Sequence, residues 1–543
     1  MPARGADVVV EALVAAGVRQ LFSLSGNQIL SIYDATVGSG IRIIHTRHEA
    51  AAVHMADAWG RLTEEPGVAL VTAGPGHLNA LSALYGALMS ESPVVLLSGA
   101  SPLSQAGRGA FQEMDQAAAA APVAKASWMA SKAERLGEDI AIALDLARNG
   151  RPGPVHVSLP GDLLESEVGG SQERLPDIHR PSMPAADADV RRLLELLEAS
   201  RHPLILTGSA MSRPARARSV ERLCAATGIP ALAIESPRGV NDPWLHMAAT
   251  YLGQADFVLL LGKRLDFAVR FGAPAAFSPS CRFVQADWDA EALDSSGRVT
   301  LGMVTDPALL AERLAEAFGS LGSGRTNGRW HAWGELVAAA RRLVPDEWHA
   351  LRRKPGSPIH PLRVGAALQP WLDGGAILVA DGGEFGQWIQ AGCEAGTRLI
   401  NGPAGSIGSA LPMALGARLA HPERTVIAAL GDGTFGFHGF ELDTALRCGL
   451  PAVAVVGNDA RWNAEHQLQR QQYGADRAVG CELLPSRYDQ LAAALGGHGE
   501  YVERAEELEP AIERAVRSGL PACVNVVIEG LAAPTYHRAN PAH

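Results

Sequence analysis

Two acidic residues in the last third of the chain have the types and spacing that suit binding of a hard cation. Asp432 stands in a Gly-Asp-Gly turn directly after the apolar run Thr425 to Leu430, and Asp459 follows a second apolar run, Pro451 to Val456. A helical pattern over Glu441 to Cys448 separates the runs, which predicts neighbouring parallel strands with both carboxylates at one edge of the sheet. Such an edge, beside a helix N-terminus, is where phosphates bind and where Mg²⁺ joins phosphate to carboxylate. The tripeptide alone is equally typical of an ordinary turn, so the prediction depends on a second segment.

That second segment lies near the N-terminus, where the apolar run Ile41 to His45 leads into Arg47-His48-Glu49. Taken alone, Glu49 is an acidic residue at a helix start, stabilised by the helix macrodipole. Together with the order strand, Gly-Asp-Gly, helix, strand, Asn-Asp, however, the segment resembles thiamine-diphosphate (ThDP) enzymes. The superfamily is that of acetolactate synthase, pyruvate decarboxylase, benzaldehyde lyase and 2-hydroxyacyl-CoA lyase.

This resemblance implies a catalytic role for Glu49. Thiamine becomes a nucleophile only when its C2 proton is lost, and a carboxylate that hydrogen-bonds the pyrimidine N1′ favours the tautomer whose imino nitrogen takes that proton. Four further segments follow the superfamily's order, although each could be a plain loop or helix cap. They are Gly74 to Asn79, Phe111 to Glu113, Gly153 to Val155, and Gly405 to Gly408.

The resemblance also implies a metal and cofactor site. Asp432 and Asp459 are expected to ligate Mg²⁺ through their side chains and Arg461 through its backbone carbonyl. Because the superfamily commonly has asparagine as the second ligand, an alternative makes Asn458 the ligand and Asp459 a turn residue. Ile407 is expected to wedge thiamine into its bent form, or else to be a core side chain. The full set of expected cofactor contacts is Gly383, Glu384, Phe385, Gly405, Ile407, Gly431, Gly433, Thr434, Phe435 and Trp462.

Polar side chains of the matching segments are expected to face the substrate. Gln28 and His77 could orient a carbonyl or protonate an alkoxide, with Gln112 beside them, while His77 could equally cap a helix. Leu468 stands where acetohydroxyacid synthases have the tryptophan that selects their second substrate. The stretch Tyr251 to Asp256 is too poor in glycine to resemble their flavin site, so FAD is not expected. The remaining candidates, placed by alignment, are Asn27, Trp462 and Gln467.

The composition of the chain limits its partners. The 543 residues are 47% hydrophobic and carry a formal net charge of −11 without a basic stripe, which argues against nucleic-acid or anionic-membrane partners. The six cysteines are dispersed and form no C-x-x-C pair, which predicts reduced thiols and a cytoplasmic protein. No apolar run approaches the ~20 residues that a membrane helix needs.

Apolar runs alternating with helical patterns predict an α/β fold of three doubly wound parallel-sheet domains, with sheets covered on both faces. By resemblance these are a pyrimidine-binding domain (1–165), a central domain (186–318) and a diphosphate- and Mg-binding domain (358–543). Proline and glycine predict linkers over 166–185 and 319–328, the second followed by a helical connector through Leu351. The other expected strands are Arg19 to Leu24, Val68 to Thr72, Val94 to Ser98, Val155 to Ser158, Leu204 to Thr207, Phe257 to Gly262, Phe283 to Ala286, Ala376 to Asp381 and Cys523 to Ile528.

The function implied is a ThDP- and Mg-dependent carbon-carbon lyase or carboligase that acts on 2-oxo acids or 2-hydroxy ketones. The alternatives are a 2-hydroxyacyl-CoA lyase or oxalyl-CoA decarboxylase, and a catalytically inactive ThDP-fold regulator. Because Glu49 and the two aspartates lie in different domains, and the superfamily binds its cofactor between subunits, a homodimer or homotetramer with active sites at the subunit interfaces is expected.

Overall fold

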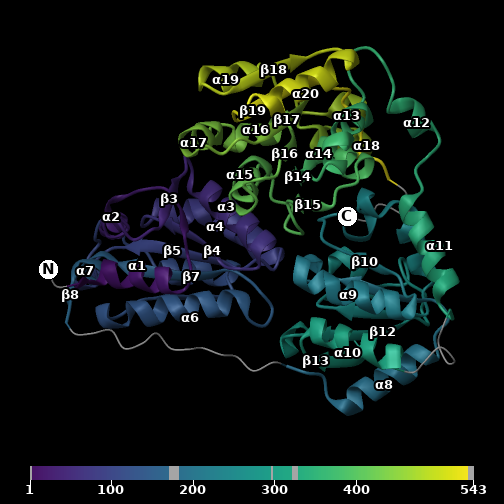
Figure 1. Ribbon diagram of the computed structural model, residues 1–543, viewed down its shortest axis with the longest axis horizontal. Coiled ribbons are helices and arrows are strands. Elements are labelled where there is room, and N and C mark those ends of the chain that lie inside the picture. Colours follow the sequence, from purple (N-terminus) through teal and green to yellow (C-terminus); the bar gives the residue numbers. More distant parts are fainter. Residues whose placement is uncertain (1–2, 170–182, 295–296, 321–327, 536–543) are drawn as a thin grey trace. The chain divides into compact units, whose positions relative to one another are not determined.

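Three parallel β-sheets form the framework of the computed structural model, which describes residues 3–169, 183–294, 297–320 and 328–535 (Figure 1). The described residues of the N-terminal and C-terminal parts of the chain, 3–169 and 351–532, pack into one unit, which contains two six-stranded sheets. The described residues between 183 and 350 form a second unit around a five-stranded sheet. The expected α/β fold with three parallel-sheet domains is confirmed.

The first domain contains a six-stranded parallel sheet between two layers of helices. Its strands, in spatial order, are β3 (Arg42–His45), β2 (Gln20–Ser23), β4 (Gly67–Val71), β5 (Val94–Ala100), β7 (Val155–Pro160) and β6 (Ala126–Met129). Its longer helices are α1 (Gly5–Ala15), α3 (Glu49–Thr63), α4 (Pro75–Met89) and α6 (Leu136–Arg148), and shorter ones are α2 (Leu30–Ala35), α5 (Gln116–Ala120) and α7 (Gly161–Glu165). Helices α1 and α6 share a core on one face of the sheet, while α3 and α4 cover the other.

The third domain repeats this architecture. Its strands, in spatial order, are β15 (Thr397–Ile400), β14 (Ile377–Ala380), β16 (Val426–Gly431), β17 (Val453–Asn458), β19 (Ala522–Val527) and β18 (His498–Val502). Counted along each domain, both sheets have the strand order 2-1-3-4-6-5. The helices are α13 (Pro361–Asp373), α14 (Gly383–Gly392), α15 (Ala410–Ala420), α16 (Asp432–His438), α17 (Glu441–Cys448), α18 (Asn463–Tyr473), α19 (Tyr488–Ala494) and α20 (Leu508–Arg517).

The first and third domains share one hydrophobic core. Helix α3 lies beside α15 in Figure 1, and buried alanines of both helices belong to the same cluster. The contact is close because α15 carries Gly416 where a Cβ atom would lie 2.5 Å from the backbone oxygen of Met55. The alanine-rich sequence after Glu49 is thus the surface on which the third domain packs.

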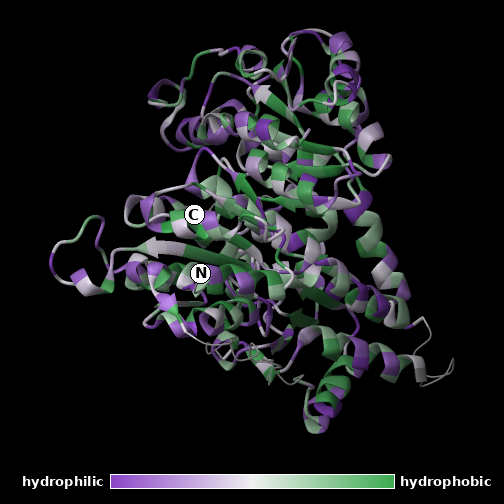
Figure 2. Cartoon of the chain, turned by 60° about the vertical axis from the view of Figure 1, so that its left-hand side comes forward, coloured by the Kyte–Doolittle hydropathy of each residue, from purple (hydrophilic) through white to green (hydrophobic). Residues whose placement is uncertain are grey.

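The second unit is a separate doubly wound sheet with the strand order β10 (Ala231–Ala233), β9 (Pro203–Thr207), β11 (Phe257–Leu261), β12 (Arg282–Asp287) and β13 (Val299–Val304). Its helices include α8 (Asp187–Glu198), α9 (Pro214–Thr227), α10 (Pro307–Ser320) and α11 (His331–Arg342), followed by α12 (Glu347–Leu351) in the connector. In all three sheets the strands are largely apolar, as Figure 2 shows.

The strands that the sequence did not predict share a position. β6, β10, β13, β15 and β18 are all edge strands, with mostly half-exposed side chains. β10 is only three residues long, and the sequences of the other four contain polar residues or glycine that interrupt an apolar run. The linker prediction for 166–185 was wrong at Glu167–Val168, which form β8 and pair antiparallel with β1 (Ala3–Arg4). Residues 170–182 and 321–327 lie outside the described residues, and the second predicted linker begins later than expected, since α10 extends to Ser320.

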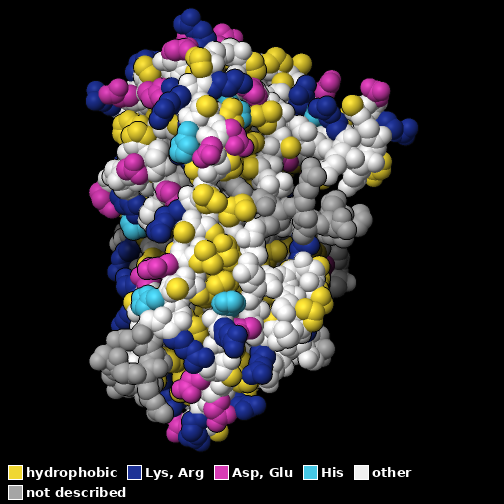
Figure 3. Space-filling view, turned by 90° about the vertical axis from the view of Figure 1, so that its right-hand side faces the viewer, with side chains coloured by type: hydrophobic (Ala, Val, Ile, Leu, Met, Phe, Trp, Pro, Cys, Tyr) yellow, Lys and Arg dark blue, Asp and Glu magenta, His cyan; other side chains and the backbone are white. Residues whose placement is uncertain are grey.

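Charged side chains of both signs are intermixed on the face shown in Figure 3. Within the described ranges, no helix is both long and apolar enough to cross a membrane. All six cysteines are free thiols.

Candidate active site

The two predicted metal ligands lie at the carboxyl edge of the third domain's sheet. β16 ends at Gly431, directly before Asp432 opens α16, and Gly431 pairs in register with Gly457 at the end of β17. The chain order reverses between β14 and β16, and ligands of doubly wound sheets bind outside the carboxyl ends of strands at such a switch point.

A small pocket of about 80 Å³ opens at this switch point. Every metal and cofactor residue predicted from the sequence lines it, except Gly405 and Phe435. Phe435 is instead buried and packs against Tyr488 at a ring-centroid distance of 4.9 Å. The lining residues are Gly382, Gly383, Glu384, Phe385, Ile407, Gly431, Asp432, Gly433, Thr434, Gly457, Asp459, Arg461, Trp462, Asn463, Ala464 and Glu465.

The electrostatics of the pocket suit a cation. Burial raises the pKa of Asp432 to about 6, and burial together with the nearby Asp432 charge raises the pKa of Asp459 to about 7. The Oδ2 atom of Asp432 is buried and has no hydrogen-bond partner. Two desolvated carboxylates of this kind fit a bound divalent ion, which would offset their charges and supply the missing partner.

The ligand set would have to be mixed, because the described residues contain no group of three or more His, Cys, Asp and Glu side chains able to hold a metal. Two aspartates with a backbone carbonyl and diphosphate oxygens meet that requirement. The alternative ligand, Asn458, is engaged elsewhere. Its Nδ2 donates to Ser486 O and Asn525 Oδ1, at 3.0 and 3.1 Å, and its Oδ1 accepts from Ala460 N.

Two glycines allow aromatic walls to approach the pocket. A Cβ atom at Gly433 would lie 2.7 Å from the indole ring of Trp462, and one at Gly457 would lie 2.4 Å from the ring of Phe385. Ala460, between Asp459 and Arg461, adopts a φ of 55°, which is unusual for a residue with a side chain. The tight turn brings Asp459 and Arg461 to the same pocket.

Asp381 links the start of α14 to the loop that carries Ile407. Its buried carboxylate accepts from the backbone N–H groups of Gly382 at 2.7 Å, Gly408 at 3.1 Å and Ala410 at 3.0 Å. Burial raises its pKa to about 6 despite these three donors. On the far side, the Nδ1 atom of His438 lies 2.7 Å from Gly408 O. The loop that carries Ile407 is therefore fixed at both its N–H and its carbonyl group.

Glu49 belongs to a second cluster, in the first domain. It is the first residue of α3, its side chain is 7% exposed, and its Oε2 accepts from Asn79 Nδ2 at 3.0 Å. The N-terminal turn of α4 lies close, since a Cβ atom at Gly76 would be 3.3 Å from Glu49 Oε1. Glycine at that position keeps the space beside the carboxylate open.

Gln28 and Gln112 meet at the switch point of the first sheet, between β2 and β4. Gln28 Nε2 donates to Gln112 Oε1 at 2.9 Å, and Thr72 Oγ1 donates to Gln28 Oε1 at 2.6 Å. Gln112 has a φ of 60° and packs against Gly74, where a Cβ atom would approach to 2.9 Å. Both sheets thus place candidate residues at equivalent positions.

The remaining predicted substrate residues have other surroundings. His77 is fully buried, with Nδ1 2.9 Å from Ser98 Oγ and its ring 4.6 Å from that of His156. Burial lowers its pKa to about 4, so the ring is neutral at pH 7. Gln467 donates to Asn463 Oδ1 and Gly530 O, at 3.0 and 3.1 Å. Asn27 and Leu468 are exposed, Leu468 by 52%.

The fold and the two sites together define a class, that of ThDP-dependent enzymes. The chain has three doubly wound domains, with an acidic, phosphate-sized pocket in one of them and a glutamate at a helix start in another. Models of the thiamine pyrophosphate enzyme match it in order: the N-terminal TPP binding domain at residues 3–119, the central domain at 190–314 and the C-terminal TPP binding domain at 381–526. The chain therefore belongs to the thiamine pyrophosphate enzyme family.

Curated relatives cover nearly its full length. A probable acetolactate synthase of Mycobacterium bovis is 36% identical over 533 residues, which span 96% of this chain and 95% of the relative. The acetolactate synthase isozyme 3 large subunit of Escherichia coli is 30% identical, with 97% and 95% covered. A 2-hydroxyacyl-CoA lyase of Oryza sativa is 28% identical, with 98% and 96% covered.

Proposed function

We propose that this enzyme is a ThDP- and Mg²⁺-dependent carbon-carbon lyase or carboligase that acts on 2-oxo acids or 2-hydroxy ketones. The observation that carries the proposal is the pocket at the β14–β16 switch point, where desolvation raises the pKa of both Asp432 and Asp459 and where Asp432 Oδ2 has no hydrogen-bond partner. A diphosphate bound there would lie at the N-terminus of α16, and helix N-termini favour anions.

Bound ThDP would supply the nucleophilic carbon and the electron sink that cleavage needs. The chain's own residues would bind the ion and the cofactor and would control the proton at the cofactor. Asp432 and Asp459 would hold the ion, and Ile407 and Trp462 would shape the pocket around the cofactor. Glu49 would hold the proton at the pyrimidine N1′.

Gln28 and Gln112 would orient the substrate's carbonyl oxygen through their amide groups, since each amide offers both a donor and an acceptor. His77 has its Nε2 buried and without a hydrogen-bond partner, so its role in proton transfer would need that atom to become accessible.

A second copy of the chain would complete the site. Helix α4 carries no charged residue, yet it exposes Leu78 by 49% and Tyr85 by 41%. Phe437 and Phe440 are exposed by 53% and 57%. An uncharged, partly apolar face beside Glu49 and Asn79 is typical of a surface that a partner subunit buries, so we propose at least a homodimer, in the cytoplasm.

The 2-hydroxyacyl-CoA lyase activity remains the second candidate, because the lyase relatives match over the same length as the synthase relatives. The purified protein, loaded with ThDP and Mg²⁺, would be incubated with pyruvate, benzoin, acetoin and a 2-hydroxyacyl-CoA, and products identified by mass spectrometry. Carboligation or cleavage products from pyruvate, benzoin or acetoin would support the first candidate. Release of an aldehyde from the 2-hydroxyacyl-CoA, with no product from the other substrates, would favour the second.

The role of Glu49 is tested by Glu49→Gln, which should lower kcat by several orders of magnitude while ThDP and Mg²⁺ remain bound, because an amide cannot stabilise a protonated N1′. Glu11→Gln, on the exposed face of α1, is the matched control and should leave kcat unchanged. Near-normal turnover in Glu49→Gln would remove Glu49 from the mechanism.

A further inference from the structure

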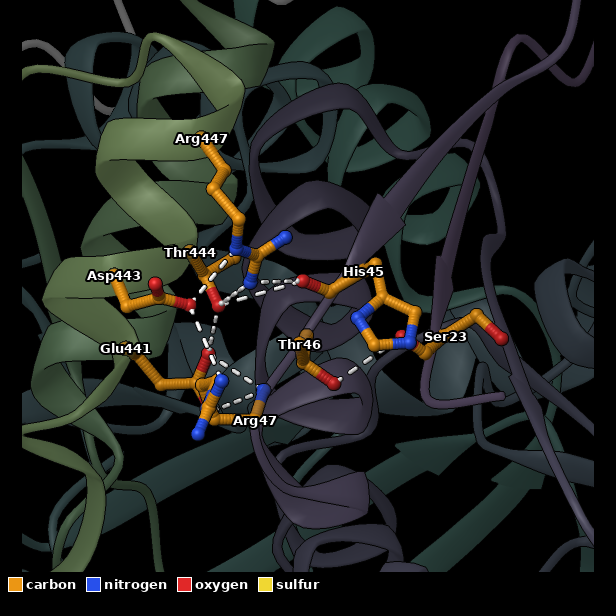
Figure 4. A network of polar contacts seen from close by, with 8 residues as sticks. All are labelled: Ser23, His45, Thr46, Arg47, Glu441, Asp443, Thr444 and Arg447. Carbon is orange, nitrogen blue, oxygen red and sulfur yellow. Dashed lines mark hydrogen bonds and ion pairs between the residues drawn. The ribbon is translucent and has the colours of Figure 1, made fainter. Parts of the chain in front are cut away.

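A carboxylate of the third domain reaches into the turn that leads to Glu49. Glu441, the first residue of α17, is 1% exposed. Its Oε1 and Oε2 atoms accept from the backbone N–H of Arg47, at 3.0 and 3.2 Å (Figure 4). This bond joins residues 394 positions apart in the chain, and its acceptor comes from a domain other than the one that contains Glu49.

The same turn is held on several sides. Thr444 Oγ1 donates to Glu441 Oε2 at 2.7 Å, and thereby orients the carboxylate. Arg447, one helical turn further along α17, donates to His45 O at 2.8 Å. On the opposite side, Thr46 N donates to Ser23 O at 2.8 Å. The peptide groups on both sides of Thr46 are therefore fixed between β2 and α17, as Figure 4 shows.

The position of this turn determines the position of Glu49. His48 is the N-cap of α3, where its Nδ1 accepts from Ala50 N at 3.1 Å, and Glu49 follows as the first helical residue. A helix is stiff along its axis, so a displacement at Arg47 is transmitted to the Glu49 backbone and to its bond with Asn79.

The use of a carboxylate at this place is costly. Burial raises the pKa of Glu441 to about 7, even though Thr444 and the N–H groups of Arg47 and His48 stabilise the charged form. Burying a carboxyl group disfavours folding, and ionisable groups with perturbed pKa values cluster at functional sites.

We propose that Glu441 is a positioning residue for catalysis: by accepting from the Arg47 amide it sets where α3 begins and thus where the Glu49 carboxylate stands. The proposal rests on the function proposed above only in the role given to Glu49. Glu441 itself does not line the pocket proposed for the cofactor.

The test compares Glu441→Ala, Glu441→Gln and Asp443→Asn. Glu441→Ala removes both acceptors, whereas Glu441→Gln keeps the volume and one acceptor oxygen. Asp443→Asn is the control on the same helix: Asp443 forms ion pairs with the side chains of Arg447, at 2.8 Å, and Arg47, at 3.7 Å, and asparagine keeps an acceptor oxygen for Arg447. Exposed pairs of this kind contribute little.

The first readout needs no activity. In the protein without cofactor, hydrogen-deuterium exchange of the peptide that contains residues 45–50 should be about 10-fold faster or more in Glu441→Ala, less so in Glu441→Gln, and unchanged in Asp443→Asn. Exchange in residues 426–434, which carry the pocket, should stay at the wild-type rate.

The second readout separates positioning from folding. With ThDP and Mg²⁺ bound, kcat should fall about 100-fold in Glu441→Ala and less in Glu441→Gln, as expected for a displacement of about 1 Å at the reacting group. KM and the Kd for ThDP should change by less than about 3-fold, since the pocket residues are untouched. Asp443→Asn should retain wild-type kcat.

Several outcomes would overturn the proposal. Unchanged exchange at residues 45–50 in Glu441→Ala would show that the bond does not hold the turn. Faster exchange there with unchanged kcat would show that the turn does not position Glu49. If Glu441→Ala fails to fold, Glu441→Gln decides by the same two readouts. An inactive wild type that still binds ThDP would defeat the proposed function instead, and the exchange experiment would still test the bond.

Discussion

Replacing Gly433 by alanine is a direct test of the pocket at the β14–β16 switch point. Gly433 is buried in α16, and a methyl group there would lie 2.7 Å from two carbon atoms of the Trp462 ring. Carbon atoms in contact are normally 3.5–4.0 Å apart, so the ring has to retreat by about 1 Å. Trp462 has little freedom to move. Its backbone N–H donates to Cys481 O at 2.8 Å, and the ring of Phe437 packs edge-on against its indole at a centroid distance of 6.2 Å.

The size of the effect follows from this overlap. Overpacking of a well-packed site costs about 1–3 kcal/mol. The pocket holds only about 80 Å³, so relieving the strain by turning Trp462 into it would remove space that the cofactor needs. Binding would then have to reverse that movement, and the Kd for ThDP should rise by roughly 10- to 100-fold.

The assay is calorimetric titration of ThDP in the presence of excess Mg²⁺, with size-exclusion chromatography to confirm an unchanged oligomeric state. Gly436→Ala is the matched control, because it lies in the same helix and no atom stands within 4 Å of its added methyl group. That variant should bind ThDP normally and be slightly more stable. Normal binding in Gly433→Ala, or equal losses in both variants, would refute the assignment of this pocket to the cofactor.

Three further outcomes are expected. Asp459→Ala should lose binding of both Mg²⁺ and ThDP, as measured by calorimetry. Asn458→Ala should instead keep cofactor affinity and lower Tm, because it loses the hydrogen bonds to Ser486 and Asn525. The reverse pattern would make Asn458 the ligand. The purified protein should be colourless and active without FAD, and a stoichiometric flavin spectrum would contradict this. Burial raises the pKa of Asp381 from 3.8 to about 6. The contribution of Asp381 to the free energy of unfolding is therefore fully present below pH 3.8 and is lost as the pH rises through 6, a change of about 3 kcal/mol. Asp381→Asn should flatten that part of the curve of Tm against pH, and an unchanged curve would contradict this prediction.

The residues that sequence reasoning placed well lie at the carboxyl ends of buried strands. Asp432 and Asp459 follow continuous apolar runs, and those runs are adjacent strands in register, as the helical stretch between them predicted. The backbone decides this kind of position, because a parallel sheet delivers successive strand ends to one edge. A local pattern in the sequence was therefore sufficient.

Other residues have neighbours that no local pattern reveals. His77 was expected either to face substrate or to cap a helix, and its ring is buried against Ser98 and His156, which belong to β5 and β7. Edge strands such as β13 were not predicted; the sequence of β13 includes Thr300 and Gly302 and so has no continuous apolar run. The neighbours that bury the His77 ring come from other strands of the domain.

Asp381 and Glu441 show why the supporting residues of the site were not recognised. Each is a buried carboxylate that accepts from backbone N–H groups of a distant loop, at Gly408 and Ala410 in one case and at Arg47 in the other. Asp381 directly follows β14 and precedes the expected cofactor contacts, and Glu441 begins α17, but neither position indicates which distant loop its carboxylate binds. A carboxylate can fix a loop in this way without dictating that loop's side chains, since its partners are amides that every residue except proline provides. An acidic residue that directly follows a fully apolar strand is therefore a candidate support even when its own surroundings in the sequence carry no signal.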